Sequence, residues 1–325
     1  MERETLPYVL ILGNCQDAHA NHLHLKLTEA GFPTEFLETA LFPTKVRVSW
    51  EPATKSGYLT LPSAKRLPFQ AIRSVFWRTF TSAKIPKLPY AQDGHLAFND
   101  AMSTLRTFMQ GTSIRWVNSW QAYQFHKEKP LQLRAVEQLG VQIPKTLIGN
   151  DPIAIREFAQ NHSKVIFKPV YGGAHTKSLE PKHLALERLE LALQLSPIAL
   201  QEYIPGTNLR VYVIGNALYA AEIRSAAIDF RSDQEAHIVP LEIPDKIQQQ
   251  SHQIARALGL TWTAIDWRLT PEGKFVFLEA NPSPMFIHFE RQTQYPITQA
   301  LINVLTQEHL TVAGWRAKSQ NPVLS

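Results

Sequence analysis

The stretch AIDWRLTPEGKFVFLEANPSP, residues 264–284, predicts a β-hairpin with acidic residues near its open end. Two β-rich runs flank the turn Thr270–Gly273, whose Pro and Gly are typical turn residues. Glu279 and Asn281 are two residues apart, so they share one face of their strand. With this turn, two residues on opposite strands share a face when their residue numbers sum to an odd value. Asp266 and Glu279 meet this condition, which places Asp266 opposite or diagonal to Glu279, within roughly 5–8 Å.

Two carboxylates held together on otherwise apolar strands repel each other unless a cation joins them. Ligands that are all oxygen indicate Mg²⁺, which binds through one or two carboxylates plus substrate phosphates. Asp266, Glu279 and Asn281 are therefore candidate Mg²⁺ ligands. The alternative is a pair of acids that face solvent at a sheet edge and bind no metal.

A second candidate site is KVIFKPVYGGAH, residues 164–175, in which a strand leads to Lys168 and then to Gly172 and Gly173. Glycines let backbone N–H groups approach a phosphate, and lysine adds a positive charge. Taken alone, the pattern is also typical of a structural turn. The chain contains neither G-x-x-x-x-G-K-[ST] nor G-x-G-x-x-G, which argues against P-loop and Rossmann dinucleotide sites.

A third candidate is ALQEYIPGTNLRVYVIG, residues 199–215. An extended linker can offer backbone groups to an adenine edge while neighbouring side chains hold the ribose. Arginines that follow it add forked donors for phosphate or carboxylate oxygens, although each one separately is also typical of a protein surface. The arginines are Arg210, Arg224 and Arg231.

The whole chain alternates between strand and helix patterns and has the length for two or three compact units. The first 115 or so residues read as a small α/β domain with an irregular basic insertion. Strands are expected at 8–12, 34–37, 74–77, 165–167, 198–203, 209–214, 217–224, 264–269 and 274–280. Helices are expected up to Gly31, over 121–139 with a break near Pro130, and over 152–158, 182–195, 245–258 and 297–305.

The net charge of +5 is unevenly placed. Between Lys45 and Lys87 lie nine basic residues and one acidic residue, Glu51. This segment is either a solvated surface or a docking site for an acidic substrate or peptide. No nucleic-acid-binding motif is present, so we do not assign it to nucleic acid. Cys15 is the only cysteine, which excludes an internal disulfide, and no signal peptide or membrane span is evident, so we expect a cytoplasmic protein.

The order of these features resembles the ATP-grasp ligases, and most closely the RimK-like glutamate ligases and the microviridin-type (graspetide) peptide ligases. The resemblance covers roughly residues 116–305. It is carried by Lys129, Lys168 before the glycines, QEYI at 201–204, N-x-R at 208–210, Arg224, IDFRS at 228–232, AIDW and FLEANPSP. Three shorter motifs resemble the N-terminal part of the graspetide branch: D-x-H at 17–19, FWR at 76–78 and WVNS at 116–119.

The resemblance implies an ATP-grasp fold, α/β in class with α+β subdomains. The expected division is an N-terminal Rossmann-like domain at 1–118, a central subdomain at 119–203, a C-terminal subdomain with the metal site at 204–310, and a tail at 311–325. It further implies that the protein binds ATP and two Mg²⁺ ions, and that Mn²⁺ can replace Mg²⁺.

Residue roles carry over in the same way. Nucleotide contacts are implied for Lys129, Lys168, Gly172, Gly173, Gln201, Glu202, Tyr203 and Ile204. Asn208 stands where RimK-like members usually have an acidic ribose ligand, so a ribose contact there stays open. Metal ligation is implied for Asp266, Glu279 and Asn281, and contact with the phosphate or acyl group for Arg210, Arg224 and Arg231.

The implied reaction joins a carboxylate to an amine or hydroxyl through an acyl phosphate, with release of ADP and phosphate. A peptide or protein substrate, docked at the basic segment, is the interpretation we favour. The alternatives are a small-molecule amino-acid ligase, an ATP-grasp kinase and a nucleotide-binding regulatory module without turnover. The family resemblance is also compatible with a homodimer.

Overall fold

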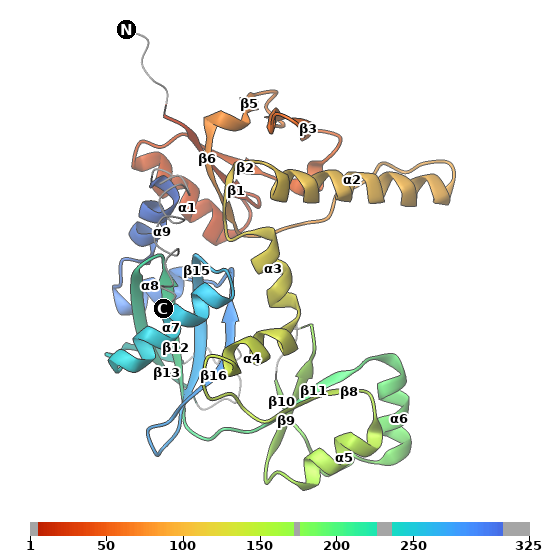
Figure 1. Ribbon diagram of the computed structural model, residues 1–325, viewed down its shortest axis with the longest axis vertical. Coiled ribbons are helices and arrows are strands. Elements are labelled where there is room, and N and C mark those ends of the chain that lie inside the picture. The colour runs from red at the N-terminus through yellow and green to blue at the C-terminus, as the bar shows by residue number, and fades with distance from the viewer. Residues whose placement is uncertain (1–5, 172–175, 226–235, 308–325) are drawn as a thin grey trace, which may run out of the picture.

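The apolar run at residues 8–12 forms the centre of a parallel sheet, as its β-branched pattern predicts. The computed structural model describes residues 6–171, 176–225 and 236–307. Its first sheet has the strand order β2-β1-β6-β7, and helix α1 follows β1 (Figure 1). Asp17 begins this helix, because its carboxylate accepts a hydrogen bond from the N–H of Ala20 at 2.8 Å. The bounds are β1 (Tyr8–Leu12), α1 (Ala18–Glu29), β2 (Thr34–Leu37), β6 (Ile72–Trp77) and β7 (Arg115–Val117).

The basic segment between β2 and β6 forms an antiparallel sheet, so the predicted irregular insertion is wrong. Leu59 and Leu67 are buried on its inner face, while the neighbouring Arg47 and Arg66 are exposed on the outer one. β3 does alternate, with half-buried Val48 and Trp50 between exposed neighbours, but β5 has only three residues and Gly57 lies inside β4, so the segment does not read as three strands. The elements are η1 (Thr39–Leu41), β3 (Arg47–Glu51), β4 (Ser56–Thr60), β5 (Arg66–Pro68) and η2 (Phe69–Ala71).

A long helix, α2 (Ala91–Gly111), projects from the N-terminal domain and is absent from the predicted elements (Figure 1). Its buried residues, Ala101, Leu105, Phe108 and Met109, all lie in the half nearer the body. The other half exposes Leu96 and Phe98 and has no partner surface among the described residues to impose an apolar stripe. Without that stripe the sequence shows no helical period there.

The central lobe begins after two helices, α3 (Trp120–Lys127) and α4 (Lys129–Glu137). The predicted break is confirmed: Glu128 separates the helices, and Pro130 lies in the first turn of α4, where a missing N–H costs nothing. Antiparallel strands in the order β10-β9-β11-β8 follow, covered by α5 and α6 (Figure 1). The bounds are β8 (Thr146–Gly149), α5 (Pro152–Gln160), β9 (Val165–Pro169), β10 (Lys177–Ser178), η3 (Pro181–His183), α6 (Leu186–Leu195) and β11 (Ile198–Glu202).

The last third is an antiparallel sheet in the order β14-β13-β12-β15-β16, with both predicted hairpins present. Its apolar faces are packed against α7 on one side and against α8 and α9 on the other. The bounds are β12 (Thr207–Ile214), β13 (Ala217–Arg224), β14 (His237–Pro240), α7 (Asp245–Ala257), β15 (Trp262–Leu269), β16 (Phe275–Asn281), α8 (Ile287–Thr293) and α9 (Ile297–Thr306).

The β15–β16 hairpin has two registers. Near the turn, Leu269 pairs with Phe275 and Trp267 with Phe277. The residue numbers in each pair sum to an even value, so the predicted odd register is wrong there. An irregularity between Asp266 and Trp267 then shifts the pairing by one residue, and Asp266 lies directly opposite Glu279. The predicted proximity of the two carboxylates is therefore confirmed, but a β-bulge produces it.

One hydrophobic core joins the N-terminal sheet to the C-terminal one. It combines Val9, Ile11 and Phe76 with Trp262 and Leu301, all of them fully buried. Figure 1 shows α9 beside α1, where it covers the joint between the two sheets. The division of the chain at 118, 203 and 310 stays a prediction, and the tail at 311–325 lies outside the described residues.

Among the described helices, none combines the length and the apolar character that a bilayer crossing demands.

Replacing Leu301 by Ala should lower the free energy of unfolding by about 2–5 kcal/mol, because the fully buried side chain leaves a cavity between the two sheets. Urea denaturation measures the change. The matched control is Leu25→Ala on α1, where the leucine is half exposed and the expected change is within about 0.5 kcal/mol. Equal destabilisation by both variants would contradict the shared core.

Candidate active site

Three neighbouring strands bring the predicted acidic residues and one arginine to the same face of the sheet. Asp266 on β15 pairs with Glu279 on β16 and with Arg210 on β12. Asn281 lies two residues beyond Glu279, opposite Ala264. Because side chains of paired residues share a face, all four candidate residues lie together. The sequence-predicted metal ligands thus converge.

Both carboxylates are engaged by cationic side chains. The guanidinium of Arg210 donates through Nε and Nη2 to the two oxygens of Asp266, at 2.7 and 2.8 Å. Lys129, from the first turn of α4, donates through Nζ to Glu279 Oε2 at 2.5 Å. Each of these four side chains is less than a quarter exposed. The pairs are therefore shielded from bulk water, and each carboxylate is held in a defined position.

The charges of these pairs reinforce one another. Burial alone would raise the pKa of Glu279, but the attraction of Lys129 and then of Lys168 lowers that pKa to about 2. Burial opposes the charge of Arg210, yet the attraction of Asp266 outweighs it and raises the pKa of the guanidinium. Glu279 and Arg210 are consequently ionised at neutral pH, and the acidic pair faces cationic side chains from α4, β9 and β12.

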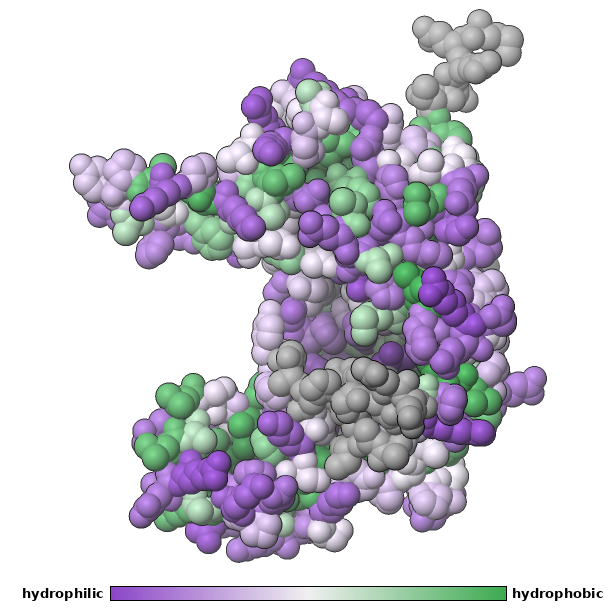
Figure 2. Space-filling view, turned by 180° about the vertical axis from the view of Figure 1, so that it is seen from behind, coloured by the Kyte–Doolittle hydropathy of each residue, from purple (hydrophilic) through white to green (hydrophobic). Residues whose placement is uncertain are grey.

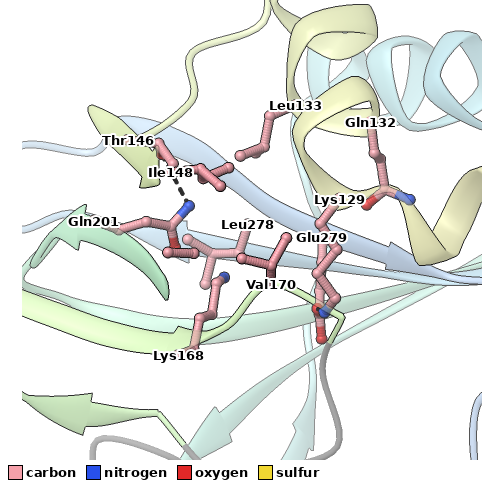
Figure 3. Close-up of a pocket in the computed structure, with 11 residues that line it drawn as sticks. Lys129, Gln132, Leu133, Thr146, Ile148, Lys168, Val170, Gln201, Leu278 and Glu279 are labelled. Carbon is pink, nitrogen blue, oxygen red and sulfur yellow. Dashed lines mark hydrogen bonds and ion pairs between the residues drawn. The ribbon is translucent and has the colours of Figure 1, made fainter. Parts of the chain in front are cut away.

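Lys129 and Lys168 line the same pocket, together with Glu279, Gln201 and Leu278 (Figure 3). Lys168 enters it from β9 of the central lobe, and Glu279 from the C-terminal sheet. The cavity volume is only about 10 Å³. This is far below the volume of about 300–1,000 Å³ of small-ligand sites. A cavity of about 660 Å³ adjoins it and shares Leu133, Thr146 and Ile148 as lining residues.

The predicted adenine linker borders this pocket with one side chain. Gln201 is buried, and its amide donates to the hydroxyl of Thr146 at 3.0 Å. Glu202 points elsewhere, because its carboxylate accepts from the N–H of Lys145 at 2.8 Å. The linker then leaves β11 through Tyr203 and Ile204, where Tyr203 N–H donates to Lys164 O at 2.9 Å.

Arg268 anchors that linker, and the sequence reasoning missed it. Its guanidinium donates to Ile204 O at 2.9 Å, to the hydroxyl of Tyr203 at 3.1 Å and to Asn208 Oδ1 at 2.5 Å. The side-chain oxygen of Asn208 is thus directed at an arginine, in the position usually given to an acidic ribose ligand. A signal was available: Arg268 lies two residues after Asp266 on the same strand and directly opposite Asn208.

Two other polar residues also escaped notice, and both hold the strand that carries Glu279. Gln132 on α4 donates to Ala280 O and accepts from Ala280 N–H, at 3.1 and 2.9 Å. The ring of His126 contacts Ala280 O through Nδ1 at 3.0 Å. Gln132 is three residues after Lys129, hence on the same helix face, and this spacing was the readable signal.

Of the remaining predicted residues, the described one, Arg224, is not brought to the acidic pair. Arg224, at the end of β13, is exposed and pairs with Glu222 at 2.9 Å. Gly172, Gly173 and Arg231 lie outside the described residues. Within the described ranges, no group of three His, Cys, Asp or Glu side chains could hold a metal by itself. An ion at Asp266 and Glu279 would need Asn281 or ligands from a substrate.

Comparison with protein families decides the class of the chain. A model described as a RimK-like ATP-grasp domain matches residues 126–305, more than half of the sequence. The chain belongs to the RimK-like ATP-grasp family. It is accordingly an ATP-grasp ligase.

Two curated ligases are similar in sequence to this RimK-like protein. D-alanine–D-alanine ligase of Aquifex aeolicus is 29% identical over 174 residues, which span 48% of this chain and 58% of that ligase. A probable α-L-glutamate ligase of Saccharophagus degradans is 25% identical over 208 residues, spanning 61% and 68%. The chain thus matches less than two thirds of the first relative's length.

Solved structures match almost the whole RimK-like chain, the N-terminal domain included. The ATP-grasp ligase PsnB complexed with minimal precursor has a TM-score of 0.77 at 29% identity, and the match covers 91% of this chain and 97% of PsnB. The macrocyclase MdnC from Microcystis aeruginosa MRC, bound with precursor peptide MdnA, has a TM-score of 0.80 at 24% identity, covering 93% and 100%. The MdnC likeness shows the fold alone.

Replacing Arg268 by Met should weaken ATP binding about tenfold, or about 1.4 kcal/mol, because the linker loses its three anchors. Calorimetric titration with a non-hydrolysable ATP analogue measures the Kd. Arg256→Met, at an exposed position on α7, is the matched control and should leave the Kd unchanged. A folded Arg268→Met protein with normal affinity would show that the anchor has no part in nucleotide binding.

Proposed function

We propose that this RimK-like protein activates a carboxylate as an acyl phosphate and transfers the acyl group to an amine or hydroxyl of a peptide. The observation that carries the proposal is the convergence of Lys129, Lys168 and Arg210 on the paired carboxylates Asp266 and Glu279. Phosphoryl transfer to a carboxylate brings anions together, and such a site must supply positive charge in advance.

The chemistry of the donor set fits Mg²⁺. Asp266, Glu279 and the side-chain oxygen of Asn281 offer oxygen only, and Mg²⁺ prefers few carboxylates plus phosphate oxygens. The positions at the two carboxylates are already taken by cations, an arginine and a lysine. We therefore assign metal binding to these three residues and expect Lys129 and Arg210 to move to phosphate oxygens when nucleotide and metal bind.

The reaction has two steps. A carboxylate oxygen of the substrate attacks the γ-phosphorus of ATP, the bond to the β–γ bridging oxygen breaks, and ADP leaves. Bound Mg²⁺ would neutralise phosphate charge during this step. An amine or hydroxyl then attacks the acyl carbon, the C–O bond to phosphate breaks, and phosphate leaves while the nucleophile loses its proton to solvent. Arg210 and Lys168 stabilise the oxyanion, so no side-chain nucleophile is required.

A peptide substrate is supported by the shape and charge of the N-terminal domain. PsnB, solved with its minimal precursor, matches this domain as well as the ligase core. Arg47 and Arg66 lie on the outer face of the β3–β5 sheet, on the two strands that flank Thr60 of β4, and Arg66 and Tyr58 line a concavity of about 700 Å³. Figure 2 shows the molecule hollowed between projecting α2 and the lobe that carries α5 and α6.

The basic surface is smaller than the sequence suggests. Of the nine basic residues between Lys45 and Lys87, Arg73 and Arg78 point into the domain interface, and Lys65 pairs with Glu35. The six that are exposed are Lys45, Arg47, Lys55, Arg66, Lys84 and Lys87. We assign the docking of an acidic peptide segment to this surface.

The second candidate is a small-molecule amino-acid ligase, which the similarity to D-alanine–D-alanine ligase and to the probable α-L-glutamate ligase favours. The deciding experiment measures ADP release with ATP and Mg²⁺, with and without hydroxylamine, over a panel of amino acids and acidic peptides. A peptide hydroxamate supports the proposal. An amino-acid hydroxamate establishes the second candidate, a stable phosphorylated alcohol indicates a kinase, and ATP binding without ADP release indicates a regulatory module.

Replacing Glu279 by Ala should lower kcat at least about 100-fold, or about 2.7 kcal/mol in barrier, because a metal-binding carboxylate and the partner of Lys129 are both lost. Initial rates of ADP release measure the effect. Glu272→Ala in the turn of the same hairpin is exposed and should leave the rate unchanged. Near-normal turnover by the Glu279→Ala variant would contradict the assignment of Glu279 as a metal ligand.

Reversing the charge at Arg47 and Arg66 to Glu should weaken acidic-peptide binding at least about tenfold and flatten its dependence on salt, because long-range attraction is lost. Fluorescence anisotropy of a labelled acidic peptide at two ionic strengths reports both. The charge-matched control is Lys246→Glu with Arg256→Glu, two exposed positions on α7. Equal losses in the two double variants would show a net-charge effect and no docking site.

A further inference from the structure

Three motifs of the N-terminal domain meet at the loop that follows the acidic strand β16. The motif residues Asp17, Arg78 and Asn118 follow strands β1, β6 and β7. Because these strands are parallel, their carboxyl ends lie at one edge of the sheet. That edge contacts Pro282 and Ser283, one and two residues beyond Asn281.

Arg78 makes the central contact. Its Nη1 donates to Ser283 O at 2.8 Å and to Ser283 Oγ at 3.1 Å, and Ser283 Oγ donates back to Arg78 O at 2.8 Å. The side chain is only 10% exposed. A guanidinium held by this many bonds is fixed in orientation, and it fixes Ser283 in turn.

Asp17 sets the position of Arg78. Both of its carboxylate oxygens accept from Arg78 Nε, at 3.0 and 3.1 Å, while Oδ1 also caps helix α1. Since Asp17 is tied to the helix and Arg78 to the strand, the forked donor has little freedom to turn away from Ser283. Asn118 supports the same loop, because its amide donates to Pro282 O at 2.8 Å.

Ser283 passes this constraint to Asn281. The N–H of Ser283 donates to Asn281 Oδ1 at 3.0 Å, which leaves the other lone pair of that oxygen for a further partner. Asn281 O accepts from the hydroxyl of Thr263 at 2.8 Å, so its backbone is also held. The chain of contacts thus runs from Asp17 through Arg78 and Ser283 to a candidate metal-binding oxygen.

We propose that Arg78 is a positioning residue for the ligase reaction, which acts through Ser283 to hold the side-chain oxygen of Asn281 in the orientation that binds metal. The proposal rests on the proposed function, in which Asn281 is a metal ligand. It assigns a role to the N-terminal domain beyond substrate docking: the domain completes the metal site of a subdomain about 200 residues later in the chain. Groups that orient a metal ligand typically contribute 10–100-fold to metal affinity.

The test is the affinity for Mn²⁺ of the full chain with a saturating non-hydrolysable ATP analogue, measured by electron paramagnetic resonance. Arg78→Gln should weaken Mn²⁺ binding about tenfold. The affinity for the analogue in EDTA, measured by calorimetry, should stay the same, because Arg78 does not line the nucleotide pocket. An unchanged Mn²⁺ affinity, or an equal loss of nucleotide affinity without metal, would overturn the proposal.

The matched control is Arg73→Gln. Arg73 lies on β6, the strand that Arg78 follows, and donates across the same domain interface, to Thr306 O on α9 at 2.8 Å, away from the metal loop. It should leave Mn²⁺ affinity unchanged, and a loss as large as that of Arg78→Gln would reduce Arg78 to a structural contact. If Arg78→Gln does not fold, Ser283→Ala decides: a several-fold weaker Mn²⁺ site supports the proposal, and an unchanged site overturns it.

The Asn281→Ala background separates this inference from the proposed function. Asn281→Ala should itself weaken Mn²⁺ binding, and adding Arg78→Gln should then have little further effect, because the two residues act in series. If the losses of Mn²⁺ affinity add fully in the double variant, the positioning role of Arg78 is contradicted but the metal assignment is not. A normal Mn²⁺ site in Asn281→Ala contradicts the metal assignment on which both rest.

Discussion

Two carboxyl groups, those of Asp266 and Glu279, face each other across neighbouring strands, and this pair constrains the rest of the active site. Such a pair is stable only if cations neutralise it. Here Arg210 on β12 and Lys129 on α4 do so directly, and Lys168 on β9 adds its attraction to Glu279. The acidic pair therefore ties the central lobe, α4 and the C-terminal sheet together.

The same ion pairs suit the proposed reaction. A metal ion that arrives with nucleotide replaces the cationic side chains at the carboxylates. The nucleotide phosphates then become the anionic partners of the displaced side chains. Lys129 and Arg210 would then be transferred from protein carboxylates to phosphate oxygens without any charge being left buried and unpaired.

Much of the fold was predictable from the sequence, because strands such as β1 and β12 are buried and carry a strong pattern. The β3–β5 sheet and α2 were missed for different reasons: β5 has only three residues and Gly57 lies inside β4, whereas half of α2 contacts no surface among the described residues that would impose a period. For the site, residue type and spacing identified Asp266, Glu279 and Lys168, and the family resemblance added Lys129. The bulge that sets the hairpin register and the link from Arg78 to Ser283 depend on tertiary packing, which spacing does not encode.

The most direct test of the account is a crystal structure of the protein with Mg²⁺ and a non-hydrolysable ATP analogue. The account predicts a metal ion about 2.0–2.1 Å from oxygens of Asp266, Glu279 and Asn281. It also predicts Lys129 and Arg210 on phosphate oxygens, with both present ion pairs broken. Nucleotide bound with the Lys129–Glu279 and Arg210–Asp266 pairs intact, or metal bound elsewhere, would contradict it.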